Sequence, residues 1–167
     1  MGEILRAAAT ADLPRISALA RWVWLDSYAS EGVSASYADH VERAFSIEAL
    51  GESAGSHWLI ESADGFLLAW AHVDPVAVCP VAVIDHGVEL AQLYVAPPCQ
   101  GRGLGLRLLR QSRELNPRRP LWLSAWEGNA GALRFYRREG ASLLGETWFE
   151  LDGQRHRNEV LGWEPLQ

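Results

Sequence analysis

A glycine-rich turn between two apolar segments carries the clearest chemistry in the sequence. The turn reads Gln100-Gly101-Arg102-Gly103-Leu104-Gly105 and follows an apolar run, Leu90 to Ala96, which predicts a strand. Leucines then recur at helical spacing until Asn116-Pro117 ends the predicted helix. The first N–H groups of a helix lack partners and carry the positive end of its dipole, and glycines let an anion approach them. This order of elements therefore predicts a phosphate site.

The residues in and after the turn separate three kinds of phosphate site. A Walker A loop ends in Lys followed by Ser or Thr, whereas Leu106-Arg107 follows here and the chain contains no lysine, so that kind is excluded. A dinucleotide-binding fingerprint matches Gly101 and Gly103 but meets Leu106 in place of its third small residue, and Pro97 to Gln100 separate it from the strand. It remains the weaker alternative, with Glu127 as its ribose-binding acid. The third pattern, Gln-x-x-Gly-x-Gly, fits without change.

A second patterned segment lies downstream of the turn. Leu121 to Trp126 predicts another apolar strand, and the sequence E-G-N-A-G-A-L-R-F-Y-R-R-E-G follows it. Asn129 is expected to cap a helix and Gly140 to end it. A second strand and helix therefore follow the predicted phosphate site.

Together the two segments resemble the GNAT superfamily of acetyl-CoA-dependent N-acetyltransferases. The turn resembles the superfamily's pyrophosphate loop. The second segment resembles its Asn-x-x-Ala-x-x-Phe-Tyr-x-x-x-Gly block, with matches at Asn129, Ala132, Phe135, Tyr136 and Gly140. The resemblance covers roughly residues 88 to 145. It implies an α/β (α+β) fold of the GNAT type: a mixed, mostly antiparallel sheet of six to seven strands, flanked by about four helices, with a splayed central parallel strand pair.

The resemblance also implies a function and a cofactor site. The expected reaction is transfer of an acetyl group from acetyl-CoA to a primary amine by direct attack in a ternary complex, without a metal. The backbone of Leu93 and Val95 would bind the pantetheine arm, and Asn129 would contact the coenzyme near it. The residues expected to hold the pyrophosphate are Gln100, Gly101, Arg102, Gly103, Leu104, Gly105 and Leu106.

Glu89 and Tyr136 are the candidate catalytic residues. Glu89 lies four residues before Leu93, where many relatives place a general base, and an apolar cleft would raise its pKa toward the working range. A solvated glutamate at a strand end is the alternative. Tyr136 corresponds to the tyrosine that protonates the CoA thiolate in many relatives, and a core tyrosine packed beside Phe135 is the alternative. The histidines at positions 57, 72, 86 and 156 are expected to be structural or exposed.

Two other functions remain open at this stage. One is a CoA-sensing or protein-binding module that keeps the glycine turn without turnover, and the other is an acyltransferase for a longer acyl-CoA. Retention of both Glu89 and Tyr136 favours the acetyltransferase. The acceptor, a small-molecule or peptide amine, is not identified by the sequence.

The elements that must position these groups are read from periodicity and turn residues. A strand at residues 4–8 and a helix capped by Thr10 or Asp12, with Pro14 in its first turn, begin the chain. Ser36 and Asp39 predict a second helix. Hairpins are expected around Asp64-Gly65 and Asp152-Gly153, with strands at residues 57–61, 66–73, 145–151 and 155–163. Residues 76–84, interrupted by Pro80, predict an edge strand or a packed loop.

The composition bounds the remaining classes. The 167 residues predict one domain, 1–167, and the net charge of −6 argues against nucleic-acid binding. The sequence shows neither a signal peptide nor an apolar run of membrane-spanning length, so we expect a cytoplasmic protein without membrane attachment. Cys79 and Cys99 are expected to be free thiols. A homodimer is left open.

Overall fold

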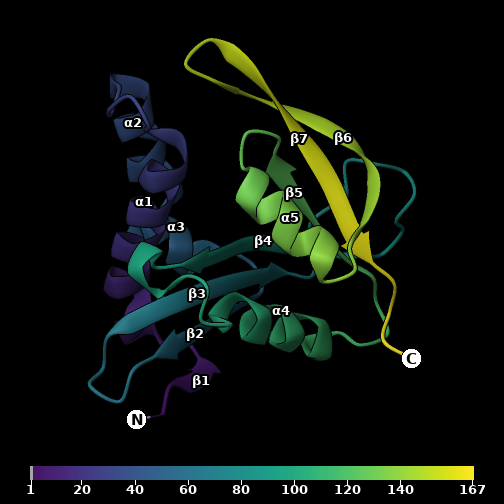
Figure 1. Ribbon diagram of the computed structural model, residues 1–167, viewed down its shortest axis with the longest axis horizontal. Coiled ribbons are helices and arrows are strands. Elements are labelled where there is room, and N and C mark those ends of the chain that lie inside the picture. The colour runs from purple at the N-terminus through teal and green to yellow at the C-terminus, as the bar shows by residue number, and fades with distance from the viewer. Residues whose placement is uncertain (1) are drawn as a thin grey trace. The chain divides into compact units, whose positions relative to one another are not determined.

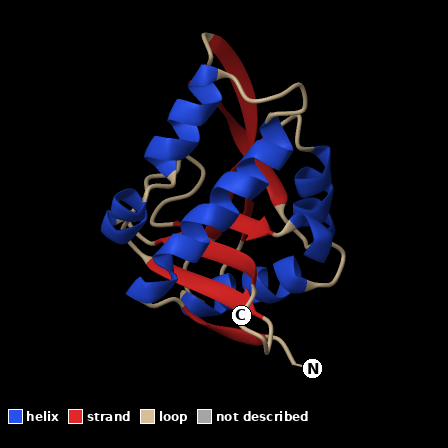
Figure 2. Ribbon diagram, turned by 90° about the vertical axis from the view of Figure 1, so that its left-hand side faces the viewer, coloured by secondary structure: helices blue, strands red, loops and turns tan. Residues whose placement is uncertain are grey.

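The structure is a computed structural model, and it describes residues 2–167 (Figure 1). The strands of this range are β1 (Ile4–Ala7), β2 (Ser56–Glu61), β3 (Leu67–Asp74), β4 (Val88–Val95), β5 (Leu121–Trp126), β6 (Ser142–Leu151) and β7 (Gln154–Trp163). Its α-helices are α1 (Leu13–Tyr28), α2 (Ala35–Ala44), α3 (Ile47–Glu52), α4 (Leu104–Leu115) and α5 (Ala130–Arg138). Figure 2 distinguishes the two kinds of element. The sequence predicts about four helices, and the described residues form four longer helices plus the short helix α3, which is only 6 residues long.

The strands form a 7-stranded sheet in the order β1-β2-β3-β4-β5-β7-β6. The pairs β1/β2, β5/β7 and β6/β7 are antiparallel, whereas β4 and β5 are parallel. In the described chain the parallel pairing joins Val88 to Leu121 and Glu89 to Trp122. It therefore involves only the first two of the 8 residues of β4. The mixed sheet with a short central parallel pair confirms the predicted fold class.

The chain forms two compact units. The first consists of the residues up to His72 together with Gln92–Leu109, and the second of Val73–Ala91 together with Arg110–Gln167. The boundaries cut through β3, β4 and α4, so each of these elements contributes residues to both units.

In the first unit, helix starts are set by serine caps. Ser34 accepts a hydrogen bond from the Tyr37 N–H at 3.2 Å, so α2 begins at Ala35, before the expected Ser36. Ser46 caps α3 in the same way, through the Ala49 N–H at 3.1 Å. Helix α1 has Pro14 in its first turn and buries an apolar face that includes Ile16 and Ala20.

An ion cluster joins the start of α1 to the β1/β2 pair. Asp12 is buried and pairs with Arg6 at 2.7 Å and with Arg15. Its carboxylate also accepts the Ala9 N–H at 2.8 Å, and Glu61 pairs with Arg6 at 2.9 Å. The hydrogen bond from Arg6 holds the pKa of Asp12 well below its usual range, and burial opposes this only in part. Asp12 therefore stabilises the entry to α1 by ion pairing rather than by capping it.

In the second unit, β6 and β7 form a long hairpin (Figure 1). Its turn residues Asp152 and Gly153 have φ of 57° and 69°, and this left-handed conformation is the one that two-residue hairpin turns require. The expected hairpin around them is confirmed. Residues 76–84 form a loop rather than an edge strand. Arg119 anchors the ends of this segment by donating to the carbonyl oxygens of Pro75 (2.7 Å), His86 (2.7 Å) and Gly87 (2.8 Å).

Candidate active site

The glycine turn leaves β4 through a short 3₁₀ turn, Pro97–Cys99. Gly101 and Gly103 then adopt φ of +74° and +80°, a left-handed conformation that other residues rarely adopt. A Cβ built on either glycine would meet no atom within 4 Å. Glycine is therefore needed at these two positions because of the backbone conformation, and not because a side chain would clash with the rest of the chain. The surface beside the two glycines is open to a ligand.

Helix α4 starts at the end of this turn. Leu104, Leu108 and Leu109 are buried and fix the helix against the first unit's core. The Arg107 N–H donates to the Gly103 carbonyl at 3.1 Å, which is the first hydrogen bond of the helix. The N–H groups of residues 104–106 precede it and have no acceptor in the helix itself. Together with the open glycines they form a site suited to an anion such as a diphosphate.

Two arginines of this region share one carboxylate. Glu3 Oε1 lies 2.6 Å from Arg102 Nη2, and Glu3 Oε2 lies 2.8 Å from Arg107 Nη1. Arg102 is one of the residues that the sequence predicts in the phosphate loop, whereas no sequence pattern assigns a role to Glu3. The two residues are 99 positions apart, so no local pattern indicates the pair.

The end of β4 carries the predicted pantetheine-binding residues. Leu93 and Val95 are half-buried. The Gln100 side chain donates from Nε2 to the Val95 carbonyl at 3.3 Å, so the first residue of the Gln-x-x-Gly-x-Gly pattern ties the turn back to the strand. Leu93, Val95 and the whole glycine turn belong to the first unit.

Glu89 belongs to the second unit and is the second residue of β4. It lies opposite Trp122 in the parallel register and is half-buried. It is therefore held within the paired part of a strand. Its role as a base remains a prediction.

Asn129 and Tyr136 belong to the second unit. Asn129 immediately precedes α5, and Tyr136 lies within that helix. Asn129 Oδ1 accepts the Ala132 N–H at 3.1 Å, which confirms that Asn129 caps the helix. Tyr136 is buried, and its ring meets those of Phe135 and Trp163 edge-on at centroid distances of 5.2 and 6.1 Å. Burial raises the pKa of the Tyr136 phenol above its ordinary value, so the hydroxyl is protonated at neutral pH, as an unshifted tyrosine also is, and is a weaker acid than one. It meets the first requirement of a proton donor.

The structure also brings together residues that the sequence analysis did not connect. The rings of His57 and His72 stack at 4.4 Å in the first unit. Trp70 Nε1 donates to His57 Nδ1 at 3.1 Å, and His57 Nε2 lies 2.8 Å from Ser53 Oγ. His72 is buried, with its nitrogens 2.9 Å from Gln92 Oε1 and 2.6 Å from the Ala54 carbonyl oxygen. Both histidines have hydrogen-bond partners within the fold and form one network, and their structural role stays a prediction.

A signal for this network was present in the sequence. His57 lies seven residues before Asp64, and His72 lies seven residues after Gly65, so a hairpin centred on that pair brings them to the same level. The rings continue from Trp70 to Tyr94 (5.7 Å) and from Tyr94 to Phe45 (6.0 Å). The contact of these rings with Phe45, the residue that follows α2, depends on tertiary packing, which the sequence pattern does not show.

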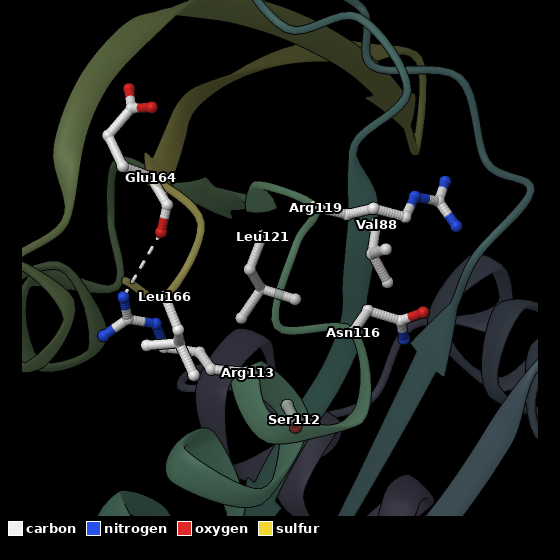
Figure 3. A pocket seen from close by; sticks show the side chains of 8 residues that line it. All are labelled: Val88, Ser112, Arg113, Asn116, Arg119, Leu121, Glu164 and Leu166. Atoms are coloured by element: carbon white, nitrogen blue, oxygen red, sulfur yellow. Dashed lines mark hydrogen bonds between the residues drawn. The ribbon is translucent and has the colours of Figure 1, made fainter.

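A surface hollow in the second unit is separate from the predicted site residues (Figure 3). Its lining residues are Val88, Ser112, Arg113, Asn116, Arg119, Leu121, Glu164 and Leu166. Arg113 donates to the Glu164 carbonyl oxygen at 3.3 Å, and the Leu166 N–H donates to the Pro117 carbonyl at 2.8 Å. These contacts attach the C-terminal segment to the region that follows α4, which is a structural role.

Among residues 2–167, no group of three or more His, Cys, Asp or Glu side chains is placed to hold a metal ion. In the same range, no helix has the length and apolar character needed to cross a bilayer.

Comparison with known proteins assigns the family. The model of the Acetyltransferase (GNAT) family matches residues 17–141, and the chain belongs to this family. An uncharacterized N-acetyltransferase in the pepI 3′ region of Lactobacillus delbrueckii subsp. lactis is 26% identical over 156 residues, which cover 90% of each chain. The predicted enzyme class, an N-acetyltransferase, is confirmed.

Solved structures show the same fold. The PaiA N-acetyltransferase of Thermoplasma acidophilum, in complex with coenzyme A, matches with a TM-score of 0.74 and 19% identity, covering 95% of this chain and 98% of that one. YncA, a putative acetyltransferase of Salmonella typhimurium with its cofactor acetyl-CoA, matches with a TM-score of 0.71 and 17% identity, covering 100% of this chain and 96% of that one.

Proposed function

We propose that this protein transfers the acetyl group of acetyl-CoA to a primary amine. The observation that carries the proposal is the glycine turn, in which two left-handed glycines in open space lead into the first N–H groups of α4, which have no acceptor within the helix. Support comes from the family match and from two structures of the same fold that contain coenzyme A or acetyl-CoA.

In this proposal each group of residues has one task. The pyrophosphate binds to the backbone of residues 100–106, and the pantetheine arm hydrogen-bonds to the backbone of Leu93 and Val95. Asn129 contacts the coenzyme near that arm. Because Asn129 Oδ1 already caps α5, the group available for this contact is its amide NH₂.

The chemistry proposed for the chain's own residues is proton transfer. Glu89, directly or through a water, accepts a proton from the ammonium of the acceptor. The nitrogen lone pair then attacks the thioester carbonyl carbon, the C–S bond breaks, and the CoA sulfur leaves with the bonding electron pair. Tyr136 gives that sulfur a proton. The nitrogen is cationic once it is bonded to the carbonyl carbon, and it loses its second proton to the Tyr136 phenolate, so that the neutral amide forms and the phenol is restored. The thioester is already activated, so positioning and these proton transfers supply the catalysis.

The experiment that tests the cofactor assignment compares two glycine variants. Gly103→Glu places a negative side chain where the diphosphate is proposed to lie, and CoA binding should be lost. Gly65→Glu is the matched control because Gly65 has nearly the same φ (+82°), also has no atom within 4 Å of a built Cβ, and lies in the β2/β3 hairpin turn. The wild type and the control should bind CoA with micromolar affinity, about −8 kcal/mol, in a calorimetric titration. Unchanged affinity in Gly103→Glu would show that the loop assignment is wrong.

A further inference from the structure

The carboxylate of Glu3 binds two arginines of the region proposed to hold the cofactor phosphates. It bridges one guanidinium from the glycine turn and one from the first turn of α4, at 2.6 Å from Arg102 and 2.8 Å from Arg107. All three residues belong to the first unit. A carboxylate beside the positive end of a helix makes the favourable electrostatic contact that a phosphate makes there.

The two arginines are held unequally. Arg107 lies in α4, and its guanidinium contacts both the Glu3 carboxylate and, at 3.4 Å, the Glu3 carbonyl oxygen. Arg102 lies between the two left-handed glycines, its side chain is 50% exposed, and its pairing with Glu3 is a single contact. Exposed ion pairs of this kind contribute little stability. Arg107 therefore anchors Glu3, whereas Arg102 can exchange its partner.

A diphosphate is the stronger partner for Arg102. It carries more charge than a carboxylate and presents several acceptor oxygens to the planar guanidinium. Arg102 also belongs to the turn proposed to bind the diphosphate, and its side chain is half-exposed.

We propose that Glu3 competes with the cofactor phosphates for Arg102, and that cofactor binding transfers Arg102 from Glu3 to a phosphate oxygen. This inference rests on the cofactor site proposed above. Glu3 then acts as a built-in competitor that lowers the affinity for acetyl-CoA without taking part in acetyl transfer. Its effect therefore belongs to KM for acetyl-CoA and not to kcat.

The test is calorimetric titration of CoA into the wild type, Glu3→Gln, Arg102→Gln and the double variant. Glu3→Gln should tighten CoA binding about two- to fivefold, the size expected when one exposed pair is removed. The gain should shrink at high salt because exposed charges are screened. Arg102→Gln should weaken binding, and in the double variant the gain from Glu3→Gln should vanish. Glu31→Gln, an exposed glutamate of the same unit, is the control for net charge and should bind like the wild type.

Steady-state kinetics supply a readout that a purely structural role would not move. Glu3→Gln should lower KM for acetyl-CoA and leave kcat unchanged. Weaker CoA binding by Glu3→Gln would overturn the proposal, because Glu3 would then hold the arginines in a productive position. A gain that persists in the Arg102→Gln background would also overturn it, by showing a long-range charge effect.

Inorganic pyrophosphate separates this inference from the proposed function. If CoA does not bind but pyrophosphate binds, with the same gain in Glu3→Gln, the competition stands and the cofactor assignment fails. If pyrophosphate binds with equal affinity to the wild type and to Glu3→Gln, the proposed competition is wrong, whether or not CoA binds. If neither ligand binds to any variant, both proposals fail.

Discussion

At the scale of single residues, the buried phenol of Tyr136 permits a test with one atom. Tyr136→Phe keeps the ring and its edge contacts with Phe135 and Trp163 but removes the proton donor. If Tyr136 protonates the leaving thiolate, kcat and kcat/KM should fall together by about 10- to 10³-fold while acetyl-CoA still binds. Steady-state assays and thermal melts of the same preparation measure both effects.

The matched control for this prediction is Tyr28→Phe. Tyr28 is a tyrosine of the first unit, stacked on Trp24 at 4.4 Å, and burial raises its pKa to about 12. It should keep wild-type turnover, since the loss of one hydroxyl costs about 1 kcal/mol of stability and no chemistry. A fully active Tyr136→Phe enzyme would show that Tyr136 is a core tyrosine packed beside Phe135 and not the proton donor.

The role of Glu89 can be tested by replacing it with the uncharged residue glutamine. Glu89→Gln should lower kcat/KM by about 10²-fold, because general-base catalysis contributes factors of this order, and should leave CoA affinity nearly unchanged. Deprotonation of the amine acceptor can mimic the acidic limb of a pH profile, so variants must be compared at one pH. Glu150→Gln, an exposed glutamate on strand β6 of the same unit, is the control. Equal activity of the two variants would remove Glu89 from the mechanism.

At the scale of elements, the His57 network gives the β2/β3 hairpin a defined pH dependence. Trp70 donates to His57 Nδ1, so that nitrogen must carry no proton. Burial, assisted by the neighbouring His72, lowers the His57 pKa from 6.5 to about 4. Between these values the unfolded chain binds a proton that the folded chain does not, so this contribution to stability is present above pH 6.5 and is lost as the pH falls toward about 4.

Thermal melts between pH 7 and pH 4 measure this loss. His57→Gln cannot titrate, so its Tm should depend less steeply on pH in this window, even if its Tm at pH 7 is lower. His86→Asn, at an exposed histidine with φ of 56°, is the control because asparagine tolerates that backbone conformation, and it should follow the wild type. Parallel curves for His57→Gln and the wild type would disprove the assignment.

The elements themselves could largely be predicted from the sequence. Local signals were sufficient for the two Asp-Gly hairpins, for the cap at Asn129 and for the glycine turn, because each depends on the conformational preferences of a few adjacent residues. The start of α2 was placed late, since Ser34 and Ser36 are equally good caps by type and only the backbone decides between them. In the candidate site, the turn was identified by its glycines. The Glu3 carboxylate was not, because its partners are remote in the chain.

At the scale of the whole molecule, the two compact units share secondary structure. Strands β3 and β4 and helix α4 each contribute residues to both units, so neither unit can unfold without breaking elements of the other. Splitting a strand or a helix exposes backbone groups that were hydrogen-bonded and apolar residues that were buried. The sequence predicts a single domain, 1–167, and we expect this domain to unfold as one cooperative system.

Scanning calorimetry tests this expectation. The wild type should show one transition whose calorimetric and van't Hoff enthalpies agree, and for 167 residues the enthalpy near 60 °C should be about 120 kcal/mol. Acetyl-CoA at about 100 times its Kd should add about 2.7 kcal/mol of stability and move the whole transition upward by roughly 5–10 °C. NADH at the same concentration should leave it in place. Two separate transitions, with acetyl-CoA raising only one of them, would show that the units are independent domains and that cofactor binding stabilises just one of them.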